Sequence, residues 1–344
     1  MKRLSMFAAL AVAVAAVAAT ATTPAKSAPT KAHSQLVFGY ISPGPDTWYQ
    51  RDVDGFKYAA AKYGVKVVVL NSQYDQQKEL ANIQSLVNQG VNGISMFSFN
   101  TNGAIQTAQQ GLKAHIPVVL TDDVGHAIKS GAKVAASIDF NWSGIGKSYA
   151  DYMAKTWPGE NFAMLAGNYQ APPTQILDKA LQAEAKKLGS NKLVYIQQTM
   201  YNPATAVNLA SDLVSSGKKF GPLFVMNDDM GAAVARFLKG KGLLNNPIHL
   251  MTENGSPVGL QMLKNGQLKY SVSSSPGWEG MVAFLALYQA AKGRISATGN
   301  AQYMLPVIPI TPESGGNPLS VVPWVPGQVH WTLTKKYFPQ LLKR

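Results

Sequence analysis

Residues 36–70 read LVFGYISPGPDTWYQRDVDGFKYAAAKYGVKVVVL and contain one complete strand–helix–strand unit. Leu36–Ile41 and Val65–Leu70 are apolar runs with the length of buried strands. Apolar residues recur between them at helical spacing and stop before Gly64, where a glycine commonly ends a helix; they are Val53, Phe56, Ala60 and Tyr63. This pattern predicts two parallel strands joined by a helix that covers the sheet.

The same alternation continues along most of the 344 residues. Further strands are expected at 93–97, 118–120, 134–138, 162–165, 193–197, 223–226, 248–251 and 270–273, with helices between most of them. Glycines that follow these helices are expected to adopt left-handed conformations; they are Gly64, Gly90, Gly189, Gly217, Gly240 and Gly266. About five strand–helix units lie on either side of residue 140, which is more than one ordinary sheet holds. The fold class predicted is α/β, with two doubly wound parallel-sheet lobes.

The N-terminus has the composition of a secretory signal peptide. Lys2 and Arg3 precede an almost unbroken apolar run, Met6–Ala19, and cleavage candidates follow at Ala19-Thr20-Ala21 and Lys26-Ser27-Ala28. A membrane anchor is the alternative, but the run is shorter than the ~20 residues that a spanning helix needs. We therefore predict an approximate leader of residues 1–28. The chain has no cysteine for lipid attachment or disulfides, so a free, exported protein is expected.

Charge and motifs exclude several function classes. The net charge is +13, but the lysines are scattered along the predicted helices, which is typical of solvated surfaces and not of a nucleic-acid interface. The sequence contains no HExxH zinc motif, no GxSxG nucleophile motif and no GxGxxG after its first strand. We therefore expect neither an enzyme nor a metal or cofactor site.

Polar and aromatic residues instead follow the predicted strands. Ligands of open α/β sheets bind beyond the carboxyl ends of the strands, and these positions hold Ser42, Asp46, Trp48, Tyr49, Asp122, Asp123, Asn227, Asn254 and Ser274. Aromatic rings can cover the C–H face of a sugar, while carboxylates and amides bind its hydroxyls. Each residue also has a structural interpretation, because Asp, Asn and Ser cap helices and aromatic residues at a helix start can be core.

These stretches together resemble the type 1 periplasmic sugar-binding proteins of ABC transporters, within the ribose-binding-like group. The similarity extends over roughly residues 36–295 and is carried by Leu36–Gly55, Leu70–Gly93, Ile116–Asp123, Met226–Met230 and Thr252–Gly259. It implies two lobes joined by three crossovers, a ligand in the cleft and hinge closure. By position it adds Tyr201 as an aromatic from the second lobe and leaves Gln175 and its neighbours where that group has an arginine.

The departures from the ribose-binding pattern affect the expected ligand. Asp123 also occupies a position where that group has an arginine, so two cations are absent and one carboxylate is added. Ribose itself is therefore doubtful, whereas another sugar, a polyol or a cationic solute fits.

The resemblance also implies an organisation and partners. We expect an N-terminal lobe of 36–138 plus 275–300, and a C-terminal lobe with tail of 139–274 plus 301–344. A monomer in the periplasm that delivers solute to an inner-membrane ABC permease is the expected role. A sensor that feeds a chemoreceptor or a histidine kinase is the alternative. A DNA-binding regulator with the same core is rejected because the leader occupies the place of its helix-turn-helix.

Overall fold

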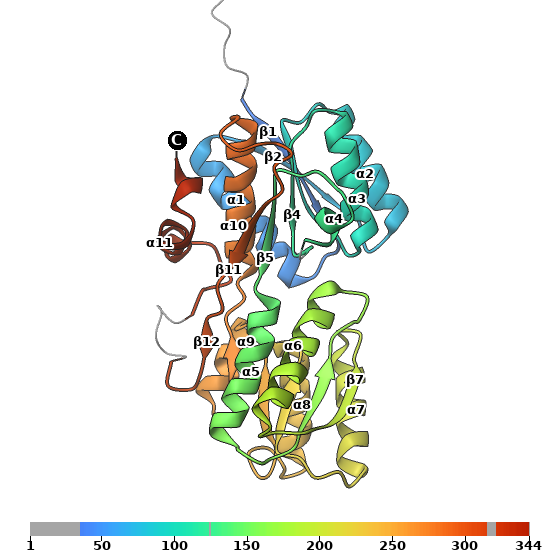
Figure 1. Ribbon diagram of the computed structural model, residues 1–344, viewed down its shortest axis with the longest axis vertical. Helices are drawn as coiled ribbons and strands as arrows, with labels where there is room; N and C mark the ends of the chain where they lie inside the picture. The colour runs from blue at the N-terminus through green and yellow to red at the C-terminus, as the bar shows by residue number, and fades with distance from the viewer. Residues whose placement is uncertain (1–34, 124, 315–320, 344) are drawn as a thin grey trace, which may run out of the picture. The chain divides into compact units, whose positions relative to one another are not determined.

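The computed structural model describes residues 35–123, 125–314 and 321–343 (Figure 1). The predicted leader, residues 1–28, lies outside these described residues. Among them, none of the helices is both long enough and apolar enough to span a membrane.

The first lobe is built on a six-stranded sheet in which every neighbouring pair is parallel. Its order is β11 (Ala301–Leu305), β5 (Ala136–Phe140), β4 (Val118–Thr121), β3 (Gly93–Phe97), β1 (Val37–Ser42) and β2 (Lys66–Asn71).

Helices cover both faces of this sheet (Figure 1). On one face α1 (Thr47–Tyr63) packs against α10 (Pro276–Ala291), and the ring centroids of Phe56 and Phe284 lie 5.4 Å apart. On the other face α2 (Gln76–Asn88) and α3 (Thr101–Lys113) bury a second apolar cluster. The four central strands, β1, β3, β4 and β5, are buried and mostly apolar, as a parallel sheet covered on both faces requires.

The second lobe has a four-stranded parallel sheet of order β7 (Leu193–Gln198), β6 (Phe162–Ala166), β8 (Pro222–Val225) and β9 (His249–Thr252). Its helices are α5 (Trp142–Thr156), α6 (Pro172–Leu188), α7 (Pro203–Ser215), α8 (Asp228–Gly240) and α9 (Pro257–Lys264). A short antiparallel pair, β10 (Ser271–Val272) and β12 (Pro309–Ile310), accompanies this sheet. The predicted fold of two doubly wound lobes is therefore confirmed.

Three chain segments connect the lobes. They run from β5 into α5, from β10 into α10, and from β11 into β12. The first and third segments leave the first lobe from adjacent strands: β11 and β5 are parallel neighbours, and Leu305 pairs with Phe140.

The boundary predicted for the tail is wrong in part. Residues 301–305 form the edge strand β11 of the first sheet, although we expected 301–344 to belong to the second lobe. The chain then ends in α11 (Gln328–Tyr337) and a 3-10 turn at Pro339–Leu342, which also pack on the first lobe. Trp278 of α10 donates its indole N–H to Thr334 of α11 at 2.9 Å, and Gln289 of α10 donates to the carbonyl of Leu341 at 2.7 Å. The prolines of residues 303–331 concealed this helix, since proline favours extended structure.

Most of the predicted left-handed glycines have positive φ angles: Gly64, Gly90, Gly189, Gly217 and Gly266. The prediction is wrong for Gly240, which is the last residue of α8. The left-handed residue is Gly242, with φ 69°, so the helix extends further than its apolar pattern indicates. A short helix α4 (His126–Lys129) was also not predicted.

Candidate functional site

The strand order places the candidate site. In the first sheet β1 lies between β2 and β3, and in the second sheet β6 lies between β7 and β8. At these two strands, successive connections run to opposite sides of the sheet. Ligands of doubly wound sheets bind at such switch points, beyond the carboxyl ends of the strands. The loops concerned follow β1 and β3 in one lobe, and β6 and β8 in the other.

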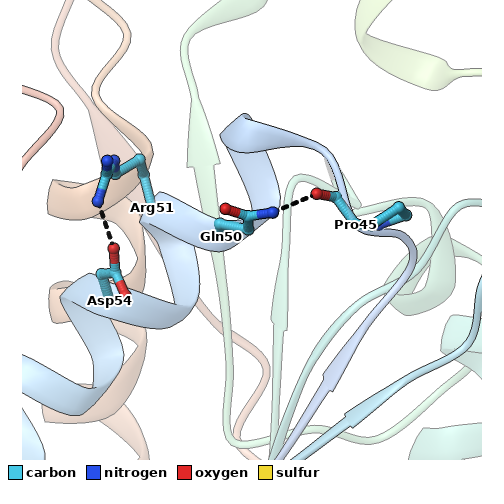
Figure 2. Close-up of polar contacts among 4 residues, drawn as sticks. All are labelled: Pro45, Gln50, Arg51 and Asp54. Carbon is cyan, nitrogen blue, oxygen red and sulfur yellow. Dashed lines mark hydrogen bonds and ion pairs between the residues drawn. The ribbon is translucent and has the colours of Figure 1, made fainter.

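The loop after β1 makes several contacts within the first lobe. The hydroxyl of buried Ser42 donates to the carbonyl of Gly44 at 3.1 Å, and the hydroxyl of Tyr74 donates to the Asp46 carboxylate. Gly44 lies against the Tyr74 ring so closely that an added Cβ would overlap it. Figure 2 shows that the Gln50 amide donates to the carbonyl of Pro45, at 2.5 Å. Asp46 begins α1 without a side-chain capping bond, so its carboxylate is bound by Tyr74 and not by the helix.

Two aromatic residues in the first turn of α1 have different surroundings. The ring of Trp48 packs edge-on against Phe140, with centroids 5.8 Å apart. The ring of Tyr49 packs against Phe97, which ends β3, at 4.9 Å. Both side chains are half-buried, which leaves part of each ring free for a ligand. The nearby cation Arg51 pairs with Asp54 at 2.7 Å, one turn further along α1 (Figure 2).

Asp122 and Asp123 follow β4 and differ in role. Asp122 has a positive φ of 52° and is 8% exposed, and its carboxylate accepts the indole N–H of Trp142 at 2.5 Å. Burial raises the pKa of Asp122 well above its ordinary value, and the charge of Asp139 adds to the effect. Asp123 accepts the backbone N–H of Ala127 at 2.7 Å, so one of its oxygens caps the α4 turn.

In the second lobe, the candidate aromatic residue is Tyr201, which is contacted by Thr174 and Gly167. Tyr201 has a φ of 56° and is 39% exposed, and its hydroxyl shares a 2.7 Å hydrogen bond with the buried hydroxyl of Thr174. Its ring lies over Gly167, where an added Cβ would be 2.6 Å from the ring carbons. Gly167 follows β6, so the second lobe's aromatic residue lies at that sheet's switch point.

Two predicted residues have mainly structural contacts. Asn227 begins α8 and accepts the N–H of Met230 at 2.9 Å, so its carbonyl oxygen serves as an N-cap. Gln175 is exposed, and its amide donates to the carbonyl of Tyr169 at 2.6 Å, which supports the loop after β6.

Asn254 and Ser274 meet around a carboxylate that sequence reasoning missed. Glu253 follows β9 and is buried, and the hydroxyl of Ser274 donates to it. The Asn254 amide nitrogen, when turned toward Glu253, donates to the same side chain. Burial raises the pKa of Glu253 well above its ordinary value, and the charges of Asp228 and Asp122 raise it further.

Residues of each lobe affect the pKa values of residues in the other. Burial raises the pKa of Tyr49 well above its ordinary value, and the second-lobe Tyr201 is among the groups that raise it further. Partial burial also raises the pKa of Tyr201, and the charges of Asp122 and Glu253 raise it further. The structure thus brings Tyr49, Asp122, Tyr201 and Glu253 into one electrostatic neighbourhood. Among the described residues, no group of three or more His, Asp or Glu side chains could hold a metal ion.

Comparison with known proteins identifies the family of this chain. The sequence profile of the periplasmic binding protein domain matches residues 38–295, which is more than half of the chain. The chain belongs to the periplasmic binding protein family. The resemblance drawn from the sequence is therefore confirmed.

Relatives in this family include sugar import proteins. A ribose import binding protein of Haemophilus influenzae is 24% identical over 243 residues, which cover 70% of this chain and 80% of that protein. A fructose import binding protein of Bifidobacterium longum is 26% identical over 207 residues, or 59% of this chain. That match spans 62% of the fructose protein, less than two thirds of its length.

Solved structures of ABC transporter solute-binding proteins share the fold. An ABC transporter solute-binding protein of Burkholderia graminis in complex with D-arabinose has a TM-score of 0.74 at 20% identity, covering 82% of this chain and 97% of that one. A solute-binding protein of Bacillus halodurans with bound myo-inositol has a TM-score of 0.73 at 19% identity, covering 82% and 96%.

Proposed function

We propose that this chain is the exported, periplasmic receptor of an ABC importer, and that it binds a neutral sugar or polyol between its lobes. The two lobes close over the ligand about the three crossovers, and the loaded monomer docks on an inner-membrane permease. The protein binds its ligand and does not transform it. The family membership, the sugar-import names of the relatives and the export-type N-terminus support this role.

One observation carries the proposal. Beside burial, Tyr201 of the second lobe is among the groups that raise the pKa of Tyr49 in the first, and Asp122 of the first lobe is among those that raise the pKa of Tyr201. Aromatic rings and hydroxyl-binding groups that face one another across two lobes are what a hydroxylated ring requires. A sensor that feeds a chemoreceptor or a histidine kinase would use the same site, but the relatives named here are import proteins.

The charge of the site supports a neutral ligand. Carboxyl groups are abundant in it, and the ion pairs found among the described residues involve neither Asp122 nor Glu253. An anionic solute would therefore find no cation paired with either of these two groups. Because burial raises the pKa of both carboxyls, their uncharged form is favoured, and a protonated carboxyl both donates and accepts hydrogen bonds with hydroxyl groups.

A cationic solute is the second candidate, because acidic and aromatic side chains also bind amines. The two candidates differ in their pH dependence. Binding of an amine strengthens as the site carboxyls ionise with rising pH, whereas binding of a neutral sugar to protonated carboxyls weakens.

A thermal-shift screen followed by calorimetry tests the proposal. The panel contains D-ribose, D-fructose, D-arabinose, myo-inositol and simple amines. A true ligand raises the melting temperature in proportion to ln(1 + [L]/Kd) and is recovered unchanged. Turnover of a panel compound, or stabilisation by amines alone, would overturn the assignment to a neutral sugar or polyol.

A further inference from the structure

The C-terminal tail, residues 321–343, lies beyond the stretch that matches the family profile, and its first residues cross the β10–α10 connection. The hydroxyl of Ser273 accepts the N–H of Val322 at 2.9 Å, and the hydroxyl of Ser275 donates to the carbonyl of Pro323 at 2.6 Å. The tail is therefore fixed to one of the three segments that join the lobes.

Trp324 of this tail contacts candidate ligand residues of both lobes. Its indole N–H donates to the backbone carbonyl of Asn254 at 3.3 Å. Its ring meets that of Trp48 edge-to-face, with centroids 5.3 Å apart and planes at 89°. Trp324 is only 8% exposed. It is thus a buried link between α1 of the first lobe and the loop after β9 of the second.

The backbone around Trp324 has little freedom. Its carbonyl oxygen lies against Gly277, where an added Cβ would be 2.4 Å from it. His330 of α11 is fully buried, and its Nδ1 accepts the N–H of Gly327 at 3.0 Å. The other ring nitrogen, Nε2, therefore carries the hydrogen and donates to the carbonyl of Pro323 at 2.8 Å. The residues on both sides of Trp324 are held by these contacts.

We propose that Trp324 is a positioning residue for ligand selectivity: it fixes the ring of Trp48 and the Asn254 loop in the orientation that the ligand meets. This inference rests on the function proposed above. Trp48 packs between Phe140 on its own lobe and Trp324 from the tail, so removing Trp324 removes one of two ring contacts that set its orientation. Edge-to-face pairs of this kind are favourable beyond the area that they bury.

The test compares Trp324→Ala and Trp324→Phe with a matched tail variant, Trp331→Ala. Trp331 lies on α11 and packs on Tyr63 and Tyr58, near the C-terminal end of α1, whereas Trp48 lies in the first turn of that helix. Dissociation constants are measured calorimetrically for D-ribose, D-fructose, D-arabinose and myo-inositol, well below the melting temperature of each variant.

Trp324→Ala should weaken binding of the preferred compound at least about tenfold. It should also make the dissociation constants of the four compounds more similar to one another. Trp324→Phe keeps a ring against Trp48 but loses the bond to Asn254, so it should weaken binding about two- to tenfold. Trp331→Ala should leave every constant within about twofold of the parent. Equal effects of Trp331→Ala and Trp324→Ala, or unchanged constants in Trp324→Ala, would overturn the inference.

A double-variant cycle separates positioning from general stabilisation. In a Trp48→Ala background, Trp324→Ala should cause little further loss of affinity, because the residue through which it acts is gone. If the double variant instead loses affinity by the product of the two single-variant factors, Trp324 does not act through Trp48.

A ligand-free readout keeps this inference distinct from the proposed function. The Trp48–Trp324 pair should give an exciton couplet in circular dichroism that disappears in both Trp48→Phe and Trp324→Phe. If the wild-type protein shows this couplet but binds none of the panel, the proposed sugar receptor fails while the contact stands. If the couplet is absent, the positioning role fails whatever the protein binds.

Discussion

Asp122 illustrates how one residue can serve both the fold and the site. Its left-handed backbone lets the N–H bond to Ile138 at 2.9 Å while the carboxylate reaches Trp142, the first residue of α5. The side chain thus connects the first lobe to the beginning of the crossover into the second. Burial raises its pKa and so favours the uncharged form, which can bind a hydroxyl group without a neighbouring cation.

At the same scale, Trp48→Ala should weaken ligand binding at least about thirtyfold, as loss of a central aromatic contact does. Because Trp48 is half-buried, the melting temperature should fall by less than about 3 °C. Calorimetric titration and differential scanning calorimetry on one preparation measure both quantities. A large loss of stability with affinity retained would assign Trp48 to the core.

The elements of the second lobe position Tyr201 through close backbone packing. Gly167→Ala should push the Tyr201 ring aside, because the new Cβ would lie 2.6 Å from it. We expect affinity to fall at least about fivefold, in line with the cost of overpacking. Gly240→Ala is the matched control, since that glycine ends α8 with no atom within 4 Å of an added Cβ. It should leave affinity unchanged and raise the melting temperature slightly. Equal affinity in the two variants would contradict the packing role.

The elements also show which parts of the molecule the sequence could predict. Continuous apolar strands and glycine helix ends located nearly every strand and helix of both sheets, because these patterns depend on local chemistry. Polar residues after strands indicated Asp122 and Asn254, because parallel strands bring their carboxyl ends to one edge. The partners that complete the site depend on tertiary packing. Glu253 has no signal apart from its place after β9, and Trp324 reaches the site only because the tail folds back over a crossover.

At the scale of the whole molecule, a basic chain encloses many buried carboxyl groups. Burial raises the pKa to about 7 for Asp52 and Glu79, and to about 6 for Asp123 and Asp228. Between about pH 4 and pH 7 the folded protein therefore retains protons that the unfolded chain has released. The stability that these groups contribute is fully present below their unfolded pKa and is lost as pH rises through the folded one.

The melting temperature should consequently fall by more than about 3 °C between pH 5 and pH 8. Asp52→Asn should make this decline smaller, because the Tyr40 hydroxyl, 2.5 Å from the carboxylate, keeps an acceptor while the titrating proton is removed. Scanning calorimetry across this range measures both slopes. A wild-type melting temperature that rises with pH, or an unchanged slope in the variant, would contradict the account.

Calorimetric titration tests the central claim most directly. The full chain, Trp48→Ala and Tyr201→Ala are each titrated with the neutral sugar or polyol preferred in the screen. The account predicts saturable binding of one ligand per chain and a loss of at least about tenfold in both variants, one from each lobe. Undiminished binding after substitution in either lobe would contradict a site shared between the two.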